Sequence, residues 1–377
     1  MYINKDFNHS YWEKKHLFKH YDVVVVGAGI VGLSTAISIK EKDQKRSVLI
    51  IEQGSTANGA STKNAGFACF GSVGELCDDL KTMPEDLVWE TVQMRYKGLK
   101  KLRKRLGDKH MNYLPYGGYE VFKAALELEK CSEQITYLNK RLKQNIGLKN
   151  CFVPVKKNNF GFQHIKGILK NQFEGQIDTG LMMQNLAHLA HQMGVQMLFN
   201  CGLKNFEQLK TGVQLHTNLA NLAAHKLVIA TNGFAKQLLP QLDVEPARAQ
   251  VLITKKIEGL KLKGSFHFDK GYYYFRNIDG RVLLGGGRNM DFKKENTLAF
   301  DLNQNIQKAL DQLLKTMILP NTKHEVDYRW TGIMGVGKEK KPIVKLHSKD
   351  VVLAVRMGGM GVAIGSMVGE AAAKLID

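Results

Sequence analysis

A glycine-rich turn between a valine run and an apolar helical segment constrains this chain more than any other feature. Residues 22–26 are an aspartate and four valines, as expected of a strand buried on both faces of a parallel sheet. Gly27, Gly29 and Gly32 follow at once. In this spacing the first glycine makes the tight turn, the second lets a pyrophosphate approach the backbone, and the third permits close helix–strand packing. The stretch therefore predicts a dinucleotide-binding strand, turn and helix.

The residues around this turn support the same prediction. Ile30 and Val31 begin the expected helix, whose free N–H groups and partial positive charge suit phosphates. A second expected strand, Ser47–Ile51, ends at Glu52, where a carboxylate accepts hydrogen bonds from an adenosine ribose. NAD and FAD share this arrangement, so these residues leave the choice between them open.

The segment from Gly54 to Cys69 consists of small and hydroxyl-bearing residues and shows neither a helix nor a strand period. Such a segment suits a backbone that wraps closely around a flat ligand. The alternative is a flexible loop, but Phe67 and Phe70 make the segment too apolar for a solvated linker.

Two later segments repeat the strand-and-turn pattern. Lys226–Ala230 is an expected buried strand that ends at the sequence Thr-Asn-Gly of residues 231–233. Val351–Val355 is another, followed by a second glycine-rich turn and an expected helix over Ser366–Ile376. This turn would bring a second helix N-terminus to an electron-rich group.

Together these segments resemble the D-amino acid oxidase/glycine oxidase superfamily of FAD-dependent oxidoreductases, which also includes sarcosine oxidase and L-2-hydroxyglutarate oxidase. The resemblance covers nearly the whole chain, in family order. Besides the opening turn, the matching segments are Ala60–Gly66, Gly175–Gly180, Ile229–Gly233, Pro246–Gln250, Asp279–Gly285, Trp330–Gly332, Pro342 and Gly358–Gly361. The resemblance implies FAD as the cofactor. No cysteine occupies the C-terminal segments that would face the flavin, so we expect non-covalent FAD.

The resemblance also implies the fold class: an α/β chain whose doubly wound, Rossmann-like FAD-binding domain is interleaved with an α+β substrate domain of mixed or antiparallel sheet. We expect the FAD domain from residues 18–90, 170–245 and 330–377, and the substrate domain from residues 91–169 and 246–329. Residues 1–17 would form an N-terminal extension with a short helix at Ser10–Lys14 packed on the body. A helix over Asp178–Met193 would lead to a strand over Val195–Phe199.

The resemblance places a set of residues at the FAD. Ala65, Gly66 and Phe67 would border the flavin ring, and the second glycine-rich turn would lie near its pyrimidine end. The complete expected set is Gly27, Gly29, Ile30, Val31, Gly32, Glu52, Gln53, Gly54, Ser61, Thr62, Asn64, Ala65, Gly66, Phe67, Leu203, Thr231, Asn232, Gly233, Gly358, Gly359, Met360, Gly361 and Val362.

The expected substrate strand is Gly271–Arg276, followed by a turn over Asn277–Gly280 and a return strand over Arg281–Gly285. Strand alternation puts Tyr272, Tyr274 and Arg276 on one face. Tyr272 matches the family tyrosine that contacts substrate, although sheet packing explains each tyrosine equally well.

The chain departs from the family at two arginines that bind the substrate carboxylate. Met334 and Gly359 stand in their places, and a methionine is only a weak acceptor. A standard free α-amino acid as substrate is therefore in doubt, unless another arginine takes over. The arginines in question are Arg276, Arg288, Arg329 and Arg356. The candidate catalytic residues are Tyr272, Tyr274, Arg276, Arg288 and Met334, of which Met334 fits a core-filling role equally well.

Composition limits the remaining choices. The net charge of +19 favours a solvated lysine-rich surface or an acidic partner, and no nucleic-acid module accompanies it. The five cysteines form no C-x-x-C pair, so we expect no metal site, no disulfide framework and a cytoplasmic location. Residues 1–20 lack an apolar signal core, and no run of 18 apolar residues follows.

We expect a flavoenzyme that passes hydride from a small-molecule amine, amino acid or 2-hydroxy acid to FAD. Two alternatives stay open at this point: a flavin oxidoreductase acting on modified tRNA, and an FAD-binding protein without activity.

Overall fold

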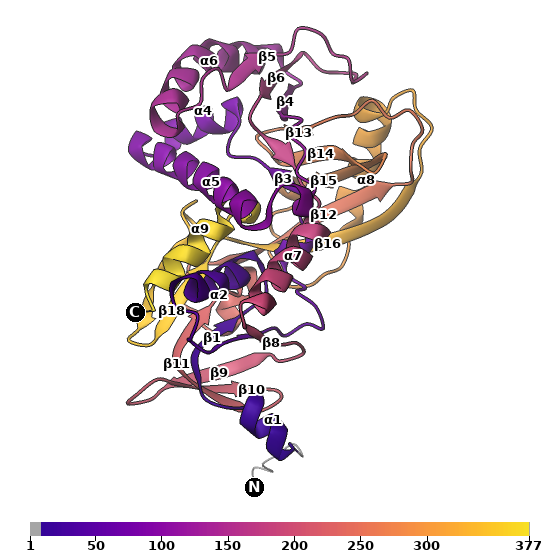
Figure 1. The fold of residues 1–377 in the computed structure, drawn as a ribbon. Helices are drawn as coiled ribbons and strands as arrows, with labels where there is room; N and C mark the ends of the chain where they lie inside the picture. Colours follow the sequence, from indigo (N-terminus) through magenta and orange to yellow (C-terminus); the bar gives the residue numbers. More distant parts are fainter. Residues whose placement is uncertain (1–8, 377) are drawn as a thin grey trace.

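The computed structural model describes residues 9–376, and its strands form two large sheets in the lower and upper halves of Figure 1. The first sheet follows the order β17-β18-β11-β1-β2-β8, and β10 and β9 extend it from β11. Its strands are β1 (Tyr21–Val26), β2 (Val48–Ile51), β8 (Gln196–Leu198), β9 (Leu203–Gln208), β10 (Val213–Thr217), β11 (Asn221–Ile229), β17 (Ile343–Ser348) and β18 (Val351–Val355).

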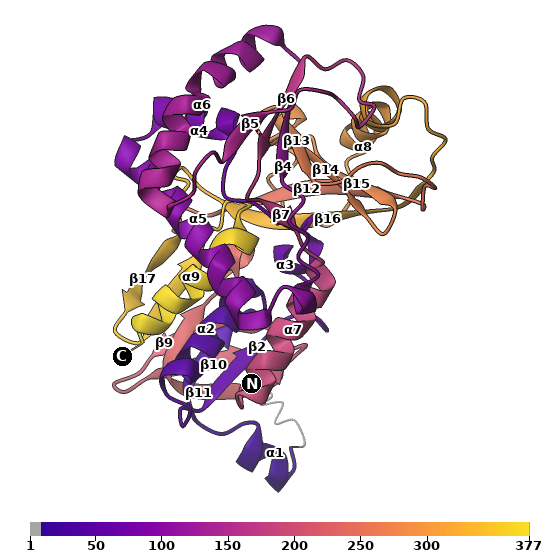
Figure 2. The ribbon, with the colours of Figure 1, turned by 45° about the horizontal axis from the view of Figure 1, so that its top comes forward.

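The centre of the first sheet is parallel, from β18 through β11, β1 and β2 to β8. Val23 and Val25 of β1 face a core beneath four helices, whereas Val24 and Val26 face a separate core on the other side. The valine run is thus buried on both faces, as predicted. Figure 2 shows the four helices gathered over one face: α2 (Ile30–Lys42), α5 (Glu85–Leu106), α7 (Thr179–Gln192) and α9 (Gly361–Lys374).

The second sheet follows the order β16-β12-β15-β14-β13-β4-β6-β5. All neighbours are antiparallel except β13 and β4. The expected fold class, an α/β chain with a mixed or antiparallel second sheet, is therefore confirmed. The strands are β4 (Gly118–Phe122), β5 (Phe152–Pro154), β6 (Gly167–Asn171), β12 (Glu245–Thr254), β13 (Ser265–Phe268), β14 (Tyr273–Ile278), β15 (Arg281–Gly286) and β16 (Val326–Val336).

The two faces of this sheet have different neighbours. Leu252, Phe275 and Leu284 pack with α8 (Gln304–Leu313) on one face. Val251 and the other alternate residues pack against Ala65 on the opposite face, which we call the inner face. The remaining elements are α1 (Tyr11–His16), α3 (Ala60–Lys63), α4 (Val73–Thr82), α6 (Ala125–Ile146), β3 (Phe67–Ala68), β7 (Gly175–Gln176), η1 (Lys109–Met111), η2 (Asn232–Gln237), η3 (Arg288–Met290) and η4 (Leu314–Ile318).

The structure corrects the expected hairpin. Strand β14 begins at Tyr273, not Gly271, because Asp269, Lys270 and Gly271 all have left-handed backbone angles. Asn277 and Ile278 stay paired with Val282 and Arg281, so the turn is only Asp279-Gly280. Both turn residues have positive φ, as a two-residue hairpin requires. Tyr272 therefore lies just outside the strand.

Other element boundaries also differ from expectation. Helix α9 begins at Gly361, not Ser366, because small residues within it let it pack closely on α2. Strand β11 begins at Asn221 rather than Lys226, since its first residues pair with β10. The segment 54–69, expected to lack regular structure, contains α3 and β3.

The expected N-terminal helix is present as α1 with a Ser10–Glu13 capping box, but it is not packed on the body as expected. None of its residues is buried, because its aromatic side chains point to solvent, and Phe18 after the helix makes the core contact. Residues 1–8 of the expected extension lie outside the described residues. The boundaries expected at residues 170 and 330 fall inside β6 and β16, so the division into domains remains a proposal.

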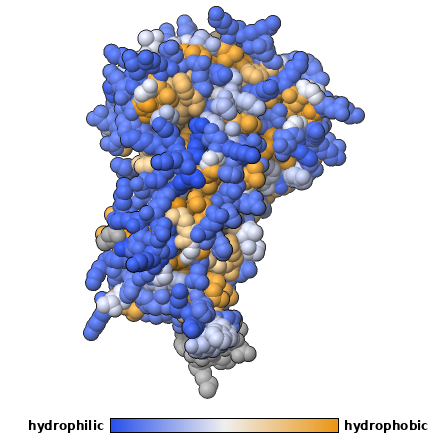
Figure 3. All heavy atoms as spheres, in the orientation of Figure 1, coloured by the Kyte–Doolittle hydropathy of each residue, from blue (hydrophilic) through white to orange (hydrophobic). Residues whose placement is uncertain are grey.

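Hydrophilic residues cover most of the face in Figure 3. The basic run on α5 is largely paired: Arg105 with Glu41 at 2.7 Å and Lys101 with Glu370 at 2.6 Å. This run is therefore not a patch of free positive charge.

Candidate functional site

The glycine-rich turn between β1 and α2 has the backbone geometry that a bound diphosphate needs. Gly27 has φ of +105°, which L side chains rarely adopt. A Cβ atom on Gly32 would lie 1.9 Å from the carbonyl oxygen of Gly27, so only glycine permits this contact of helix with turn. The N–H of Ile30 donates to Ser61 Oγ at 3.0 Å, while those of Val31 and Gly32, in the first turn of the helix, have no intrahelical acceptor.

A second helix N-terminus lies beside the first. Gly365 of α9 packs on Ile30 of α2, and Gly369 packs on Ser34, so the two helices run parallel. Gly358 and Gly359 have φ of +57° and +84° and turn the chain into α9, whose first residues are Gly361 and Val362 after the N-cap Met360. The positive ends of two helix dipoles therefore meet at one place, which suits an electron-rich group.

Glu52 lies at the end of β2 with its side chain almost fully buried. Its two carboxylate oxygens accept hydrogen bonds from the N–H groups of Ala28 at 2.9 Å and Gly54 at 3.0 Å. Each oxygen keeps a further lone pair, which suits ribose hydroxyls.

The chain that precedes Leu203 runs beside the end of β2. The N–H of Asn200 donates to the carbonyl oxygen of Gly54 at 2.9 Å, and Gly202 lies against Gln53. The structure thus brings Gln53, Gly54 and the start of β9 to the same end of the sheet as the glycine-rich turn.

Residues 231–233 connect this turn to the second sheet. Thr231 follows Ala230, whose carbonyl lies against Gly27, and its buried hydroxyl oxygen has no hydrogen-bond partner within residues 9–376. Asn232 Oδ1 accepts from the N–H groups of Arg356 and Met357, each at 3.1 Å, and Gly233 packs on the backbone of Met334. An orphaned buried hydroxyl beside the glycine-rich turn fits a bound phosphate or ribose, so the residues present fit the dinucleotide of FAD.

The segment from Ser61 to Phe67 is held firmly in place. Asn64 Oδ1 accepts from the N–H of Gly66 at 2.8 Å, and Phe67 lies in β3, which pairs with β7. The hydroxyl of Thr62 donates to two carbonyls of its own loop, those of Ala57 and Gly59. The carbonyl of Lys63 accepts from Trp330 Nε1 at 3.0 Å, which joins this segment to the inner face of the second sheet.

Tyr274 is the predicted substrate-side tyrosine that lies on the inner face opposite this segment. Its ring makes a T-shaped contact with Phe67 at 5.8 Å between centroids, and it packs with Ala65, Val251 and Leu283. Burial raises the pKa of Tyr274 to about 12, so its hydroxyl is protonated at neutral pH. A flat group bordered by Ala65, Gly66 and Phe67 would therefore lie next to Tyr274.

The guanidinium of Arg276 donates hydrogen bonds to the backbone. The side chain is 2% exposed, and Nη1 donates to the carbonyl oxygens of Ile177 at 2.7 Å and Gly66 at 3.0 Å. Burial lowers the pKa of Arg276 to about 10. A cavity of about 150 Å³ lies beyond Arg276 at the far end of β14, and of the expected site residues it touches only this one.

Tyr272 and Arg288 lie at the opposite end of β14, where β15 ends. Tyr272 is 37% exposed, and its ring contacts Phe292 at 5.8 Å. The guanidinium carbon of Arg288 lies 4.9 Å from the centroid of the same Phe292 ring. The structure thus separates Arg276 from the pair of Tyr272 and Arg288, although strand alternation had grouped the two tyrosines with Arg276.

Met334 lies on the inner face, and its sulfur approaches Gly359, so the two residues expected in place of the family arginines are adjacent. Neither Arg356 nor Arg329 reaches them as a free cation. Arg356 pairs with Asp243 and Glu339, and Arg329 pairs with Asp311 at 2.8 Å on the α8 face of the sheet.

Sequence reasoning missed a row of polar residues on the inner face. The register places Tyr274 opposite His267 and His267 opposite Glu120. Glu75 of α4 acts on His267 electrostatically and pairs with Arg95 at 2.9 Å. The sequence contains a signal for this row. His267 lies between Phe266 and Phe268, which are both buried on the α8 face, so strand alternation places His267 on the inner face.

Burial makes this row almost uncharged at neutral pH. It lowers the pKa of His267 to about 4 and raises the pKa of Glu120 to about 8. Glu174, whose carboxyl accepts from the N–H groups of Phe70 and Gly71, has its pKa raised by burial to about 8 as well. Burial alone would raise the pKa of Glu75 as well. The positive charge of Arg95 opposes this effect, and the pKa of Glu75 is lowered.

The sequence of the chain is similar to a known protein family and to individual proteins. A model of the family described as FAD dependent oxidoreductase matches residues 22–375. The Probable oxidoreductase OrdL of Haemophilus influenzae is 23% identical over 95% of this chain and 83% of that protein. Sarcosine oxidase subunit beta of Rhizobium meliloti is 22% identical over 88% of this chain and 78% of that protein.

Among solved structures, glycine oxidase from Geobacillus kaustophilus has a TM-score of 0.77 at 19% identity, over 95% of this chain and 94% of that chain. This likeness establishes the shared fold. Within residues 9–376, no helix is both long enough and apolar enough to span a bilayer.

Proposed function

Because the chain belongs to the family of FAD-dependent oxidoreductases, we propose that it oxidises an amine, an amino acid or a 2-hydroxy acid. The flavin of bound FAD would supply the hydride acceptor for this chemistry. The observation that carries the proposal is the opposition of two surfaces: the Ala65–Phe67 segment and the inner face of the second sheet with Tyr274. A flavin bordered by the first surface would have its reactive side toward the second.

We propose that the first sheet forms most of an FAD domain from residues 18–90, 170–245 and 330–377, and that residues 91–169 and 246–329 form the substrate domain. The diphosphate would lie at the N-terminus of α2, and Glu52 would accept from ribose hydroxyls. The second helix N-terminus, at Gly361, would lie near the flavin. The geometry that supports this is the parallel packing of α2 and α9, which brings both N-termini together.

The weak charge of the inner face supports a substrate that reacts in its neutral form. Tyr274 and His267 are uncharged at neutral pH, and the charge of Glu75 is compensated by Arg95. Among the described residues of the inner face, no unpaired carboxylate would stabilise an ammonium group, so an amine would lose its proton before it reacts. Tyr274 and His267 would orient the substrate by hydrogen bonds and exclude water.

The experiment is anaerobic mixing of the FAD-loaded protein with a panel of amines, amino acids and 2-hydroxy acids. We expect at least one member to bleach the visible flavin band. A band that persists with every member would contradict the proposed oxidation and favour an FAD-binding protein without activity. The names of the related sarcosine and glycine oxidases make their substrates the first to test.

We also propose that FAD binds without a covalent bond. Among the described residues, no cysteine lies in the second glycine-rich turn or in β16. Acid precipitation is expected to release all yellow colour into the supernatant.

A further inference from the structure

The cavity of about 150 Å³ beyond Arg276 is lined by two buried polar side chains that have unused hydrogen-bonding atoms. Arg276 is 2% exposed and Gln176 is 5% exposed. Within residues 9–376, Nε of Arg276 and Oε1 of Gln176 are buried and have no hydrogen-bond partner. A buried donor and a buried acceptor without partners are both costly, so their presence in one cavity points to a ligand that satisfies both.

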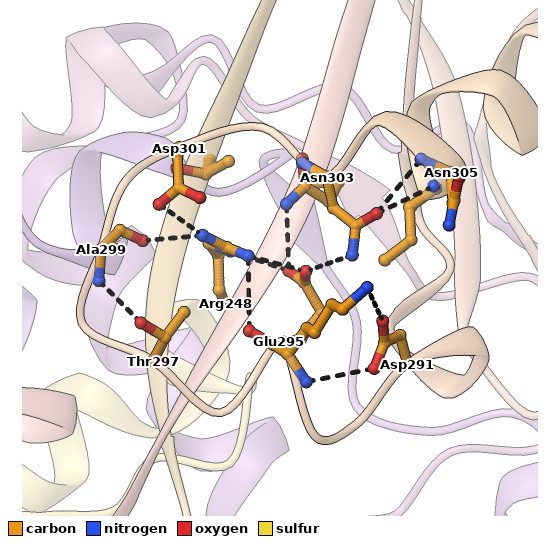
Figure 4. A network of polar contacts seen from close by, with 12 residues as sticks. Arg248, Asp291, Glu295, Thr297, Ala299, Asp301, Asn303 and Asn305 are labelled. Carbon is orange, nitrogen blue, oxygen red and sulfur yellow. Dashed lines mark hydrogen bonds and ion pairs between the residues drawn. The ribbon is translucent and has the colours of Figure 1, made fainter.

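A second buried arginine shows what the unused edge of Arg276 can bind. Arg248 is 4% exposed, and Figure 4 shows its guanidinium against Glu295. Its Nε and Nη2 donate to the two carboxylate oxygens of Glu295, each at 2.9 Å. Two parallel hydrogen bonds to one carboxylate are a strong contact of the guanidinium group.

In Arg276 the same two nitrogens have no acceptor among the described residues. Only Nη1 forms hydrogen bonds there, to the carbonyl oxygens of Gly66 at 3.0 Å and Ile177 at 2.7 Å. Asp178 and Asp279 act on the charge of Arg276, but among the described residues neither forms an ion pair with it. Asp178 instead accepts from the N–H of Leu181 at the start of α7, at 2.9 Å. The Nε–Nη2 edge is therefore available for the carboxylate of a ligand.

The amide of Gln176 has a defined orientation. Its Nε2 donates to the carbonyl oxygen of Asn277 at 3.1 Å, and because a carbonyl can only accept, Oε1 is the atom without a partner. The backbone of Gln176 exchanges two hydrogen bonds with Leu114, at 2.8 and 3.0 Å, so a fixed segment carries this side chain. The ligand must therefore offer a donor, such as an ammonium group or a hydroxyl, to Oε1.

The charged residues of the lining decide between these two donors. They are two basic side chains, Lys263 and Arg276, and two acidic ones, Asp178 and Asp279. A lining with equal numbers of both signs complements a ligand that carries one charge of each sign. An ammonium group beside Gln176 and a carboxylate on Arg276 meet this requirement, whereas a hydroxyl leaves the ligand with a net negative charge.

We propose that this cavity binds a small amino acid as a zwitterion, with its carboxylate on Arg276 and its ammonium group on Gln176. The volume limits the ligand, since a cavity of about 150 Å³ holds a molecule the size of benzene. The site is separate from the proposed reaction site, because neither Tyr274 nor any residue of the Ala65–Phe67 segment lines it.

Arg276 links the two sites. Its Nη1 holds the carbonyl of Gly66, in the segment where FAD is proposed to bind, and the carboxylate of the ligand holds the other edge of the same guanidinium. A ligand that fixes the guanidinium favours the arrangement of Gly66 that is suited to FAD. By linkage, FAD and the amino acid then raise each other's affinity by the same factor. This link rests on the proposed function, whereas binding to the cavity does not.

The test measures binding of 2-aminoisobutyrate to the FAD-loaded protein by calorimetry. This zwitterion has no hydrogen on its α-carbon, so it cannot donate a hydride to the flavin. The comparison probes are pivalate, in which a methyl group replaces the ammonium group, and 2-aminoisobutyramide, in which an amide replaces the carboxylate. We expect 2-aminoisobutyrate to bind and each comparison probe to bind at least roughly tenfold more weakly, because each lacks one charged hydrogen-bonding group.

Gln176→Met removes the acceptor and leaves Arg276 in place. It is expected to weaken binding of 2-aminoisobutyrate roughly 10- to 100-fold, as loss of a hydrogen bond to a charged group does. Gln172→Met is the matched control, because the amide of Gln172 also donates to a backbone carbonyl, that of Asn150 at 2.8 Å, but lies outside the cavity. The control is expected to keep the parent affinity.

No binding of 2-aminoisobutyrate by the parent would overturn the inference and leave water as the partner of these atoms. Equal affinity of the parent for 2-aminoisobutyrate and pivalate, or equal affinity of the parent and Gln176→Met, would overturn it as well. Saturating 2-aminoisobutyrate is expected to lower the Kd for FAD severalfold, and an unchanged Kd would refute the link through Arg276. A protein that takes up no FAD would refute the proposed function, but calorimetry on the FAD-free protein would still show the cavity site.

Discussion

Replacing Arg276 by methionine tests whether this arginine holds the Ala65–Phe67 segment, where we propose that the flavin binds, or binds substrate itself. The substitution removes the donors to the carbonyls of Gly66 and Ile177. Gly66 O keeps the N–H of Ile177 at 2.9 Å as a second donor. The unsupported group is therefore the carbonyl of Ile177, and the carbonyl of Gly66 loses one of its two donors.

Two opposing effects set the magnitude. Two hydrogen bonds from a charged donor contribute about 3–6 kcal/mol to stability. Burial lowers the pKa of Arg276 from 12.5 to about 10, which corresponds to a cost of roughly 3 kcal/mol for keeping the charge there. Methionine removes both the bonds and that cost, so we expect a net loss of about 0–3 kcal/mol in the free energy of unfolding and a protein that still folds.

The assay measures the urea midpoint of the FAD-free protein and the Kd for FAD. Arg329→Met is the control, because Arg329 lies on the α8 face of the same sheet. Looser anchoring of the Gly66 segment is expected to weaken FAD binding about tenfold, which corresponds to about 1.4 kcal/mol. The control is expected to keep the parent Kd for FAD. An Arg276→Met protein with normal FAD affinity and impaired substrate binding would refute the reasoning. Arg276 would then be a substrate-binding residue.

Three further predictions concern other parts of the site. Gly29→Val places a Cβ atom 2.9 Å from Ser61 Oγ, where we expect the diphosphate to approach the backbone. The variant is expected to abolish FAD uptake measured by visible absorbance; full occupancy would contradict the placement. Tyr272→Phe is expected to lower turnover of a reactive substrate while FAD content stays the same, and unchanged turnover would remove Tyr272 from the site. Glu120 has a folded pKa of about 8 against an ordinary 4.5, so its favourable contribution is complete below pH 4.5 and is lost as the pH rises to 8. Glu120→Gln cannot ionise, so its free energy of unfolding relative to the parent should rise by up to about 1.4 kcal/mol per pH unit across that window; a difference that does not change with pH would show that Glu120 ionises normally.

The parts of the site that depend on local spacing could be predicted from the sequence. The valine run, the turn at Gly27 and the acid at Glu52 are neighbours in the chain or in adjacent strands, and the structure has them where the pattern indicates. Their geometry follows from short-range backbone requirements, and the residue spacing that meets these requirements can be recognised in a single sequence.

The parts that depend on distant partners could not be predicted. The sequence does not show that Arg276 would be used by two carbonyls, or that Arg329 would face Asp311 across the other side of the sheet. Strand alternation also assumed that Tyr272 lay within β14, whereas three left-handed residues delay the start of the strand. These outcomes depend on tertiary contacts and on single backbone angles, neither of which has a periodic signal.

The most direct test of the account is a crystal structure of the protein with FAD bound. The account predicts the diphosphate at the N-terminus of α2 and the flavin beside the Ala65–Phe67 segment, next to Tyr274 of the inner face. A flavin bound on the α8 face, or one with Ala65–Phe67 and Tyr274 both outside contact distance, would contradict it.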